Sequence, residues 1–183
     1  SASAVQAVNK AISQGKSVYL TDDGYIVDRD TFASLLPNYA IYGDALYKVP
    51  NGPTLKPLKV YSPSYHYYWA GVDSPAHTSL VLEKLGFQIV DTAEEADVVV
   101  LESNRFDASI FGKKPTLVIG GSAMQKLEKL GVLEGFDAEK LKGGSDYEGL
   151  MKAIIDDQDP LTSGYKKNTL FYSNSGNWIE KVP

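Results

Sequence analysis

The fold is decided by the stretch Leu58–Ser122, whose sequence is LKVYSPSYHYYWAGVDSPAHTSLVLEKLGFQIVDTAEEADVVVLESNRFDASIFGKKPTLVIGGS. Its pattern predicts a strand, a loop, a helix and then three more strands, the last of which leads into Gly120-Gly121-Ser122. Asp97–Leu101 is dominated by apolar residues, which is typical of a central parallel strand covered on both faces. Strands that alternate with helices predict an α/β fold, a three-layer sandwich with a mainly parallel central sheet.

The elements of this stretch follow from local signals. The predicted parallel strands are Lys59–Ser62, Phe87–Val90, Asp97–Leu101 and Thr116–Ile119.

Two helices are predicted, one between the first two strands and one after the last. Ser74-Pro75 predicts an N-cap followed by proline at the first helical position, with Ala76, Leu80, Val81 and Leu85 facing inward and Gly86 at the end. The second helix is lined by Ala123, Leu127 and Leu130 and ends at Gly131.

The flanking segments add further elements. Before the stretch we expect a helix ending at Gly15, strands Ser17–Leu20 and Tyr25–Val27, and a helix capped by Asp30. After it, Ser145 and Glu148 form a capping box before a helix over Leu150–Ile155. Thr169–Tyr172 and Trp178–Val182 then form an antiparallel pair with each other.

Length and composition predict one domain. The chain has 183 residues, of which 43% are hydrophobic, enough for a substantial core. Asn51-Gly52-Pro53 is the one plausible internal break, between an N-terminal section over residues 1–50 and a core over residues 58–183. Because the sequence starts at Ser1 without an initiator methionine, we expect it to be a piece of a longer protein.

Charge and cysteine content exclude several classes of function. A net charge of −5 disfavours binding to a phosphate backbone, so no nucleic-acid partner is expected. No run approaches the roughly 18 apolar residues of a membrane span. The lack of cysteine excludes disulfides, thiolate metal sites and a cysteine nucleophile, and it suits an extracytoplasmic bacterial protein. With only His66 and His77 available, no metal or cofactor is expected in this chain.

Ser122 is the candidate catalytic residue, because it stands where nucleophile-elbow enzymes place theirs, between a strand and a helix. A serine nucleophile needs a base within reach, yet no histidine follows it, and Met124 replaces the second glycine of the elbow motif. The alternative is a helix N-cap. We expect Ser122 to be an N-cap and catalytically inert.

The aromatic cluster Tyr65, His66, Tyr67, Tyr68 and Trp69 is the candidate binding or interface site. It follows the first core strand, at the carboxyl edge of the sheet, where open α/β folds bind ligands. Such side chains stack on sugar rings, grip peptides or contact a partner domain. The alternative is a loop that folds over its own sheet edge. As two connections at one end of the sheet, the cluster and Ser122 should lie close together.

The remaining polar clusters favour structural roles. His77 at a helix start is expected to be a solvated or hydrogen-bonded histidine. Asp22-Asp23-Gly24 and Asp156-Asp157-Gln158-Asp159 lack the spacing of a calcium loop, so we expect a solvated turn and an acidic helix end. The glycine pair before Ser122 is not a dinucleotide fingerprint.

Three groups of motifs belong together: Lys59–Tyr61 with Ser74–Phe87, Ala96–Leu101 with Leu117–Ser122, and Asp159–Gly164 with Leu170–Asn174. Taken together, they resemble the class I glutamine-amidotransferase-like (flavodoxin-like) domain that follows the catalytic domain in some bacterial M14-family zinc carboxypeptidases. The departures are a serine in place of the amidotransferase cysteine, no downstream histidine, and no M14 zinc ligands.

The resemblance implies a noncatalytic accessory domain of a secreted zinc carboxypeptidase, extracellular or on the cell surface of a bacterium. Proteolysis and zinc would then belong to the catalytic domain of the same polypeptide, the expected partner. Two alternatives stay open: a carbohydrate- or peptide-binding module using Tyr65–Trp69, with a peptide or cell-wall ligand, and a serine hydrolase using Ser122.

Overall fold

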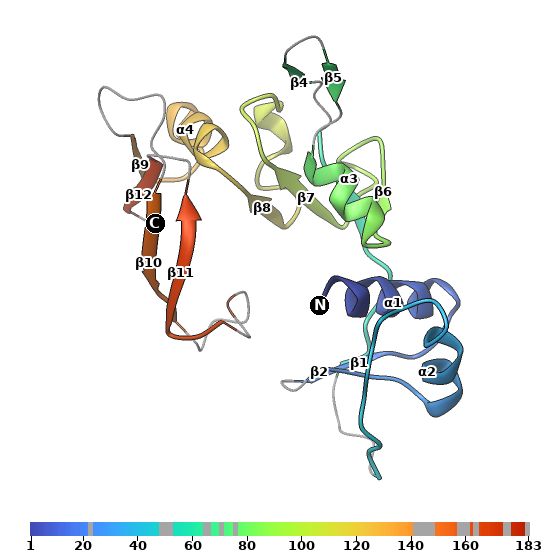
Figure 1. Ribbon diagram of the computed structural model, residues 1–183. Helices are drawn as coiled ribbons and strands as arrows, with labels where there is room; N and C mark the ends of the chain where they lie inside the picture. Colours follow the sequence, from blue (N-terminus) through green and yellow to red (C-terminus); the bar gives the residue numbers. More distant parts are fainter. Residues whose placement is uncertain are drawn as a thin grey trace. The chain divides into compact units, whose positions relative to one another are not determined.

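The computed structural model describes residues 1–21, 24–47, 53–63, 67–69, 72–74, 77–140, 149–156, 162, 165–173 and 177–181. The chain divides into two compact units (Figure 1). Ser1–Leu101 and Ser109–Leu117 form the first unit, and Glu102–Ala108 and Val118–Pro183 form the second. Two compact units can belong to one folding domain, so this division does not test the prediction of a single domain over residues 1–183.

A four-stranded parallel sheet with flanking helices makes the protein α/β, as predicted. The strand order is β6-β3-β7-β8. Val60 of β3 pairs with Ile89 of β6 on one side and with Val98 of β7 on the other. All four predicted strands are confirmed, with bounds β3 (Lys59–Tyr61), β6 (Gln88–Ile89), β7 (Val98–Leu101) and β8 (Thr116–Val118).

Buried residues of β7 and the side chain of Asp97 stabilise the middle of the sheet. Val99, Val100 and Leu101 are successive buried residues, which shows that β7 is covered on both faces. Just before β7, the backbone N–H of Asp97 donates to the Lys59 carbonyl at 2.8 Å. The Lys59 N–H in turn donates to Asp97 Oδ2 at 2.8 Å, so the amino ends of β3 and β7 are fixed to each other.

Helix α3 (His77–Lys84) ends where the sequence predicts. Gly86 takes φ +87°, its N–H donates to the Glu83 carbonyl, and the Phe87 N–H donates to the Leu82 carbonyl. This is a Schellman motif, in which the glycine tolerates the left-handed conformation.

The predicted start of this helix was wrong, and so were two of the residues predicted to face inward. Ser74 is the last residue of β5 (Val72–Ser74), which pairs antiparallel with β4 (Tyr67–Trp69), so it is not an N-cap. Leu80 and Val81 are exposed, whereas Leu82 and Leu85 are half-buried. Pro75 and Ala76 lie outside the described residues.

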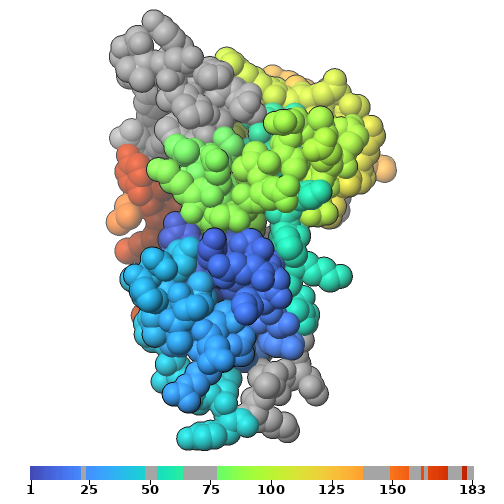
Figure 2. Space-filling model, turned by 90° about the vertical axis from the view of Figure 1, so that its right-hand side faces the viewer, coloured from blue at the N-terminus to red at the C-terminus, as the bar shows by residue number. Residues whose placement is uncertain are grey.

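The N-terminal section has a small core of its own. Its elements are α1 (Ala2–Ser13), β1 (Tyr19–Thr21), β2 (Gly24–Ile26) and α2 (Arg29–Leu35), close to the predicted ones. Figure 2 shows α1 and α2 side by side, in blue and light blue. The buried cluster consists of Ala7, Val8, Ala11, Ile12, Val18 and Leu35.

Helix α1 also binds the end of α3. Gln6 Nε2 donates to the Lys84 carbonyl at 2.9 Å, and Asn9 Nδ2 donates to the Leu85 carbonyl at 2.8 Å. These carbonyls lie past the last intrahelical hydrogen bonds of α3 and would otherwise need water. The two amides therefore join the N-terminal section to the α3 layer of the parallel sheet.

The N-cap of α2 is Asp28, so the predicted cap Asp30 was wrong. Asp28 Oδ1 accepts the Thr31 N–H at 2.8 Å, and its Oδ2 accepts the Thr31 hydroxyl at 2.6 Å. Asp30 lies in the first turn of the helix instead. The side-chain hydrogen bond from Thr31, followed by the backbone one, lowers the pKa of Asp28 below its ordinary value of 3.8.

The second unit contains helix α4 (Gly121–Leu130) and two antiparallel strand pairs. Its buried residues include Ala123 and Leu127, as predicted, and Gly131 ends the helix with φ +61°, but Leu130 is exposed. The short 3-10 helix η1 (Ala108–Ile110) precedes β8.

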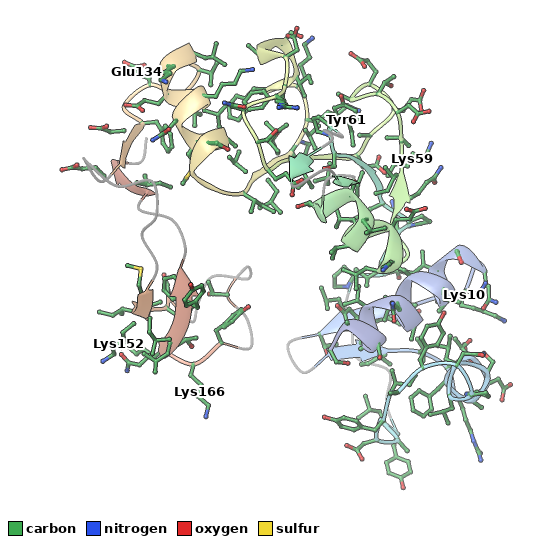
Figure 3. The ribbon with its side chains drawn as sticks, turned by 45° about the horizontal axis from the view of Figure 1, so that its top comes forward. Lys10, Lys59, Tyr61, Glu134, Lys152 and Lys166 are labelled. Atoms are coloured by element: carbon green, nitrogen blue, oxygen red, sulfur yellow. The ribbon has the colours of Figure 1, made fainter. Side chains whose placement is uncertain are left out.

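Two predictions for the C-terminal residues were wrong. Leu150–Ile155 is not a helix: β10 (Gly149–Ile154) pairs with β11 (Asn168–Ser173). The last strand, β12 (Asn177–Lys181), pairs with β9 (Asp137–Lys140), so the expected mutual pair does not form. Strand partners far apart in the chain override a local helical pattern. Ser145 and Glu148 lie outside the described residues. Figure 3 labels Lys152 on β10 and Lys166 just before β11.

We expect Asn9→Ala to lower the free energy of unfolding by about 1 to 2 kcal/mol, because it leaves a half-buried carbonyl without its donor. Chemical denaturation of the 183-residue chain measures this. The control is Lys10→Ala, an exposed position in the same helix, which should change it by less than about 0.5 kcal/mol. Equal effects of the two substitutions would contradict the role of Asn9.

We expect Asp28→Ala to lower the melting temperature at pH 7, and Asp28→Asn, which keeps a capping oxygen, to lower it less. The folded pKa of Asp28 is depressed, so its contribution is present above the unfolded pKa and is lost as pH falls through the folded one. Melting curves recorded between pH 7 and pH values below 3.8 should therefore show wild type and Asp28→Ala converging in acid. A pH-independent difference would contradict this.

Candidate functional site

The carboxyl end of the parallel sheet has a topological switch point between β3 and β7. From β3 the chain proceeds to β6 on one side, and the following strand, β7, lies on the other side of β3. In open α/β sheets the crevice outside the carboxyl ends of two such strands is the usual place for a ligand. The residues that follow β3 are thus the first candidates for binding.

The aromatic cluster begins directly beyond this end of β3. Tyr67, Tyr68 and Trp69 form β4, opposite Ser74, Asp73 and Val72 of β5. Part of the expected loop is therefore a β-hairpin inserted between β3 and α3 (Figure 1). Tyr65 and His66 lie outside the described residues.

Ser62 is a polar residue at this place that sequence reasoning missed. It is the first residue after β3 and only 5% exposed, and its hydroxyl Oγ has no hydrogen-bond partner among the described residues. A buried hydroxyl without a partner costs about 1 to 3 kcal/mol. The sequence signal that could have identified Ser62 is a serine immediately after an apolar strand. Figure 3 labels Lys59 and Tyr61 on this strand, at its two ends.

The connection between β8 and α4 has the form of a strand-to-helix turn built on glycine. Gly120 is the N-cap of α4, with φ +86° and no side-chain capping bond. Gly121 is the first helical residue and is buried. Ser122 is the second helical residue and is exposed. The predicted N-cap role of Ser122 was wrong, because the positive φ of Gly120 lets the helix begin one residue before the serine.

This geometry does not match a nucleophile elbow. In such an elbow the nucleophile itself occupies the sharp, strained turn that presents its oxygen. Here the left-handed φ belongs to Gly120, two residues earlier, and Ser122 lies within a regular helix. The second unit contains no histidine in its sequence, so it cannot supply the usual base for this serine.

Lys126, one turn after Ser122, is occupied by structural contacts. Its Nζ donates to the Asn104 carbonyl at 2.8 Å and to the Phe106 carbonyl, and it lies 4.5 Å from the centroid of the Phe106 ring. These contacts tie the loop after β7 to α4. Sequence reasoning could not find them, because two of the three partners are backbone carbonyls.

The other candidates are not brought together by the described residues. Ser122 belongs to the second unit and Tyr67–Trp69 to the first, so their expected proximity stays a prediction. His77 is the first residue of α3, and Asp156 is exposed. Asp22, Asp23 and Asp157–Asp159 lie outside the described residues. Within the described ranges, no group of three or more histidine, aspartate or glutamate side chains could hold a metal ion.

Comparison with protein families, with curated proteins and with solved structures found no match. In the part of the chain that the structure describes, no helix is both long enough and apolar enough to cross a membrane.

We expect Lys126→Met to lower the free energy of unfolding by about 1 to 2 kcal/mol, because two carbonyls lose a charged donor. The control is Lys129→Met, an exposed lysine in the same helix, which should cost less than about 0.5 kcal/mol. Denaturant titration measures both. If the two variants unfold at the same denaturant concentration, the Lys126 contacts do not stabilise the fold.

Proposed function

We propose that this chain is a noncatalytic, glutamine-amidotransferase-like accessory domain that acts beside the catalytic domain of a secreted bacterial zinc carboxypeptidase. One observation carries the noncatalytic part. At the strand-to-helix connection, where related folds place a nucleophile, Ser122 lies inside a helix, while Lys126 one turn later is bound to backbone carbonyls.

The order of the parallel sheet supports the fold part of the proposal. Numbered by sequence within the sheet, β6-β3-β7-β8 is the order 2-1-3-4. This is the order of the first four strands in flavodoxin-like sheets, the arrangement implied by the resemblance. Of the motifs that carry the resemblance, Lys59–Tyr61 is β3, Ser74–Phe87 contains α3, and Ala96–Leu101 contains β7.

A second function is favoured by a different observation. The aromatic hairpin emerges at the switch point, and the buried Ser62 hydroxyl lies at the same end of β3. A binding module for peptide or cell-wall sugar that uses Tyr65–Trp69 is therefore the alternative proposal. The serine-hydrolase alternative lacks such support, because the geometry at Ser122 does not match an elbow.

In the accessory role, the chemistry resides elsewhere in the natural polypeptide. Zinc would be held by the catalytic domain, outside the cell or on its surface. This domain would position that catalytic domain or restrict its substrates. Tyrosine and tryptophan residues after β3 suit a partly hydrated contact between domains, because each combines an apolar ring with a polar group.

The test uses the natural full-length polypeptide and the 183-residue chain in parallel. We expect the former to release C-terminal residues from peptides and to lose this activity with a zinc chelator. The isolated chain should show no peptidase, glutaminase or esterase activity and bind no stoichiometric zinc. Full-length Ser122→Ala should retain activity within about twofold, since the residue touches no reacting group.

Two outcomes would overturn the proposal. A natural polypeptide without chelator-sensitive carboxypeptidase activity removes the accessory role. Ester or amide hydrolysis by the isolated chain that disappears in Ser122→Ala assigns the hydrolase instead. Ser109→Ala, at an exposed serine outside α4, is the matched control for that substitution.

A further inference from the structure

A cavity of about 760 Å³ lies within the N-terminal section, apart from the sites discussed above. Its walls come from α1, α2, β2, the last residue of β1 (Thr21), Val27 and the segment 40–46, and they include Val8, Phe32, Leu35 and Ile41. The size falls in the range of roughly 300 to 1,000 Å³ that is typical of binding pockets, and mostly apolar walls with few polar groups are typical as well.

The cavity runs along the edge of β2. All three residues of this strand line it, although successive strand residues face opposite sides of a sheet. Strand β2 is paired only with β1, so one of its edges has no neighbouring strand among the described residues. We call this place the β2-edge cavity.

The hydrogen bonds of β1 show which backbone groups face that edge. The Leu20 N–H donates to the Pro53 carbonyl at 3.3 Å, on the side of β1 away from β2. In an antiparallel pair, the N–H and C=O of one residue point to the same side, so Leu20 and its partner Tyr25 do not bond to each other. The N–H and C=O of Tyr25 therefore point to the outer edge of β2. They offer one donor and one acceptor to an added strand.

The rim of the β2-edge cavity adds large exposed side chains and one charged side chain. Tyr42 is 97% exposed and Leu46 is 62% exposed, and both line the cavity. Asp44, between them, is the single charged side chain among the described lining residues. A carboxylate at the rim of an apolar site favours an occupant that carries a positive charge beside its apolar part.

We propose that the β2-edge cavity binds an extended peptide segment, which adds as a strand to β2 and places a bulky apolar side chain in the cavity. The peptide N–H and C=O pair with Tyr25, and a basic residue two positions from the apolar one, on the same face of the added strand, faces Asp44. Main-chain pairing supplies affinity in this mode of recognition, and the pocket and the charge supply selectivity. The inference stands independently of the accessory role.

The test measures fluorescence anisotropy of the 183-residue chain with a labelled, end-blocked peptide, Ser-Lys-Thr-Phe-Thr-Ser, in which lysine and phenylalanine share one face of the strand. Replacing the peptide's phenylalanine by alanine should weaken binding by about tenfold or more, because the ring leaves the cavity. N-methylation of the phenylalanine amide should weaken it by about tenfold, because the strand loses a donor. Replacing the lysine should weaken it about threefold, the effect of an exposed charge pair.

Matched protein variants locate the site. Ala40 lines the cavity and is exposed, so Ala40→Trp should obstruct the cavity and weaken binding about tenfold. Ala45→Trp, on the same segment but outside the lining, should leave affinity within about twofold. Asp44→Asn should abolish the preference for the lysine peptide, whereas Asp30→Asn should retain it. Thermal melts verify that each variant is folded.

Each contrary result overturns the proposal. Equal affinity for the parent and N-methylated peptides means that the cavity takes an apolar group without strand addition. Equal effects of Ala40→Trp and Ala45→Trp place binding elsewhere, and no binding of the parent peptide at millimolar concentration removes the site. None of these results bears on carboxypeptidase activity, so failure here is distinguishable from failure of the proposed function.

Discussion

The first unit depends on the hydrogen bonds that the carbonyls at the carboxyl end of α3 accept. The Schellman motif at Gly86 uses the carbonyls of Leu82 and Glu83, and the amides of Gln6 and Asn9 use those of Lys84 and Leu85. Helix-end carbonyls need such partners, or water, because no following turn supplies N–H groups. Two partners here come from a helix more than 70 residues earlier, as the separations of 78 and 76 show. The end of α3 and the docking of α1 therefore stabilise each other.

Glycine at position 86 serves this docking as well as the helix end. A Cβ at this position would lie 3.1 Å from Asn9 Cβ, and φ is +87°. Any other residue would combine backbone strain with a close approach to α1. Asp97 provides a second long-range connection, between β7 and β3. Its carboxylate accepts the Lys59 N–H, and its own N–H donates to the Lys59 carbonyl. With β3 tied to β7 in this way, the two strands that flank the switch point start in a defined register.

The connection between β8 and α4 is built on glycine and not on a strained serine. Gly120 supplies the positive φ, Ser122 lies exposed in the helix, and Lys126 holds the preceding loop. The N-terminal section, in contrast, leaves a strand edge beside an apolar cavity, and edges left open are where extended chains add.

The sequence by itself determined the features that are local or strongly apolar. The run Val98–Leu101 predicts a buried strand, because only apolar residues fit a strand covered on both faces. Gly15, Gly86 and Gly131 end their helices as expected, because each takes the positive φ that other residues avoid. The alternation of strands and helices likewise predicts a parallel sheet.

Tertiary structure decided what depends on distant partners. Residues 150–154 have an apolar spacing that suits a helix, yet they form β10, because pairing with β11 supplies a ladder that no local signal reveals. The contacts of Lys126 and the outward edge of Tyr25 rest on backbone groups, and every residue type carries the same backbone groups. A sequence of side chains does not record which of these groups meet in space.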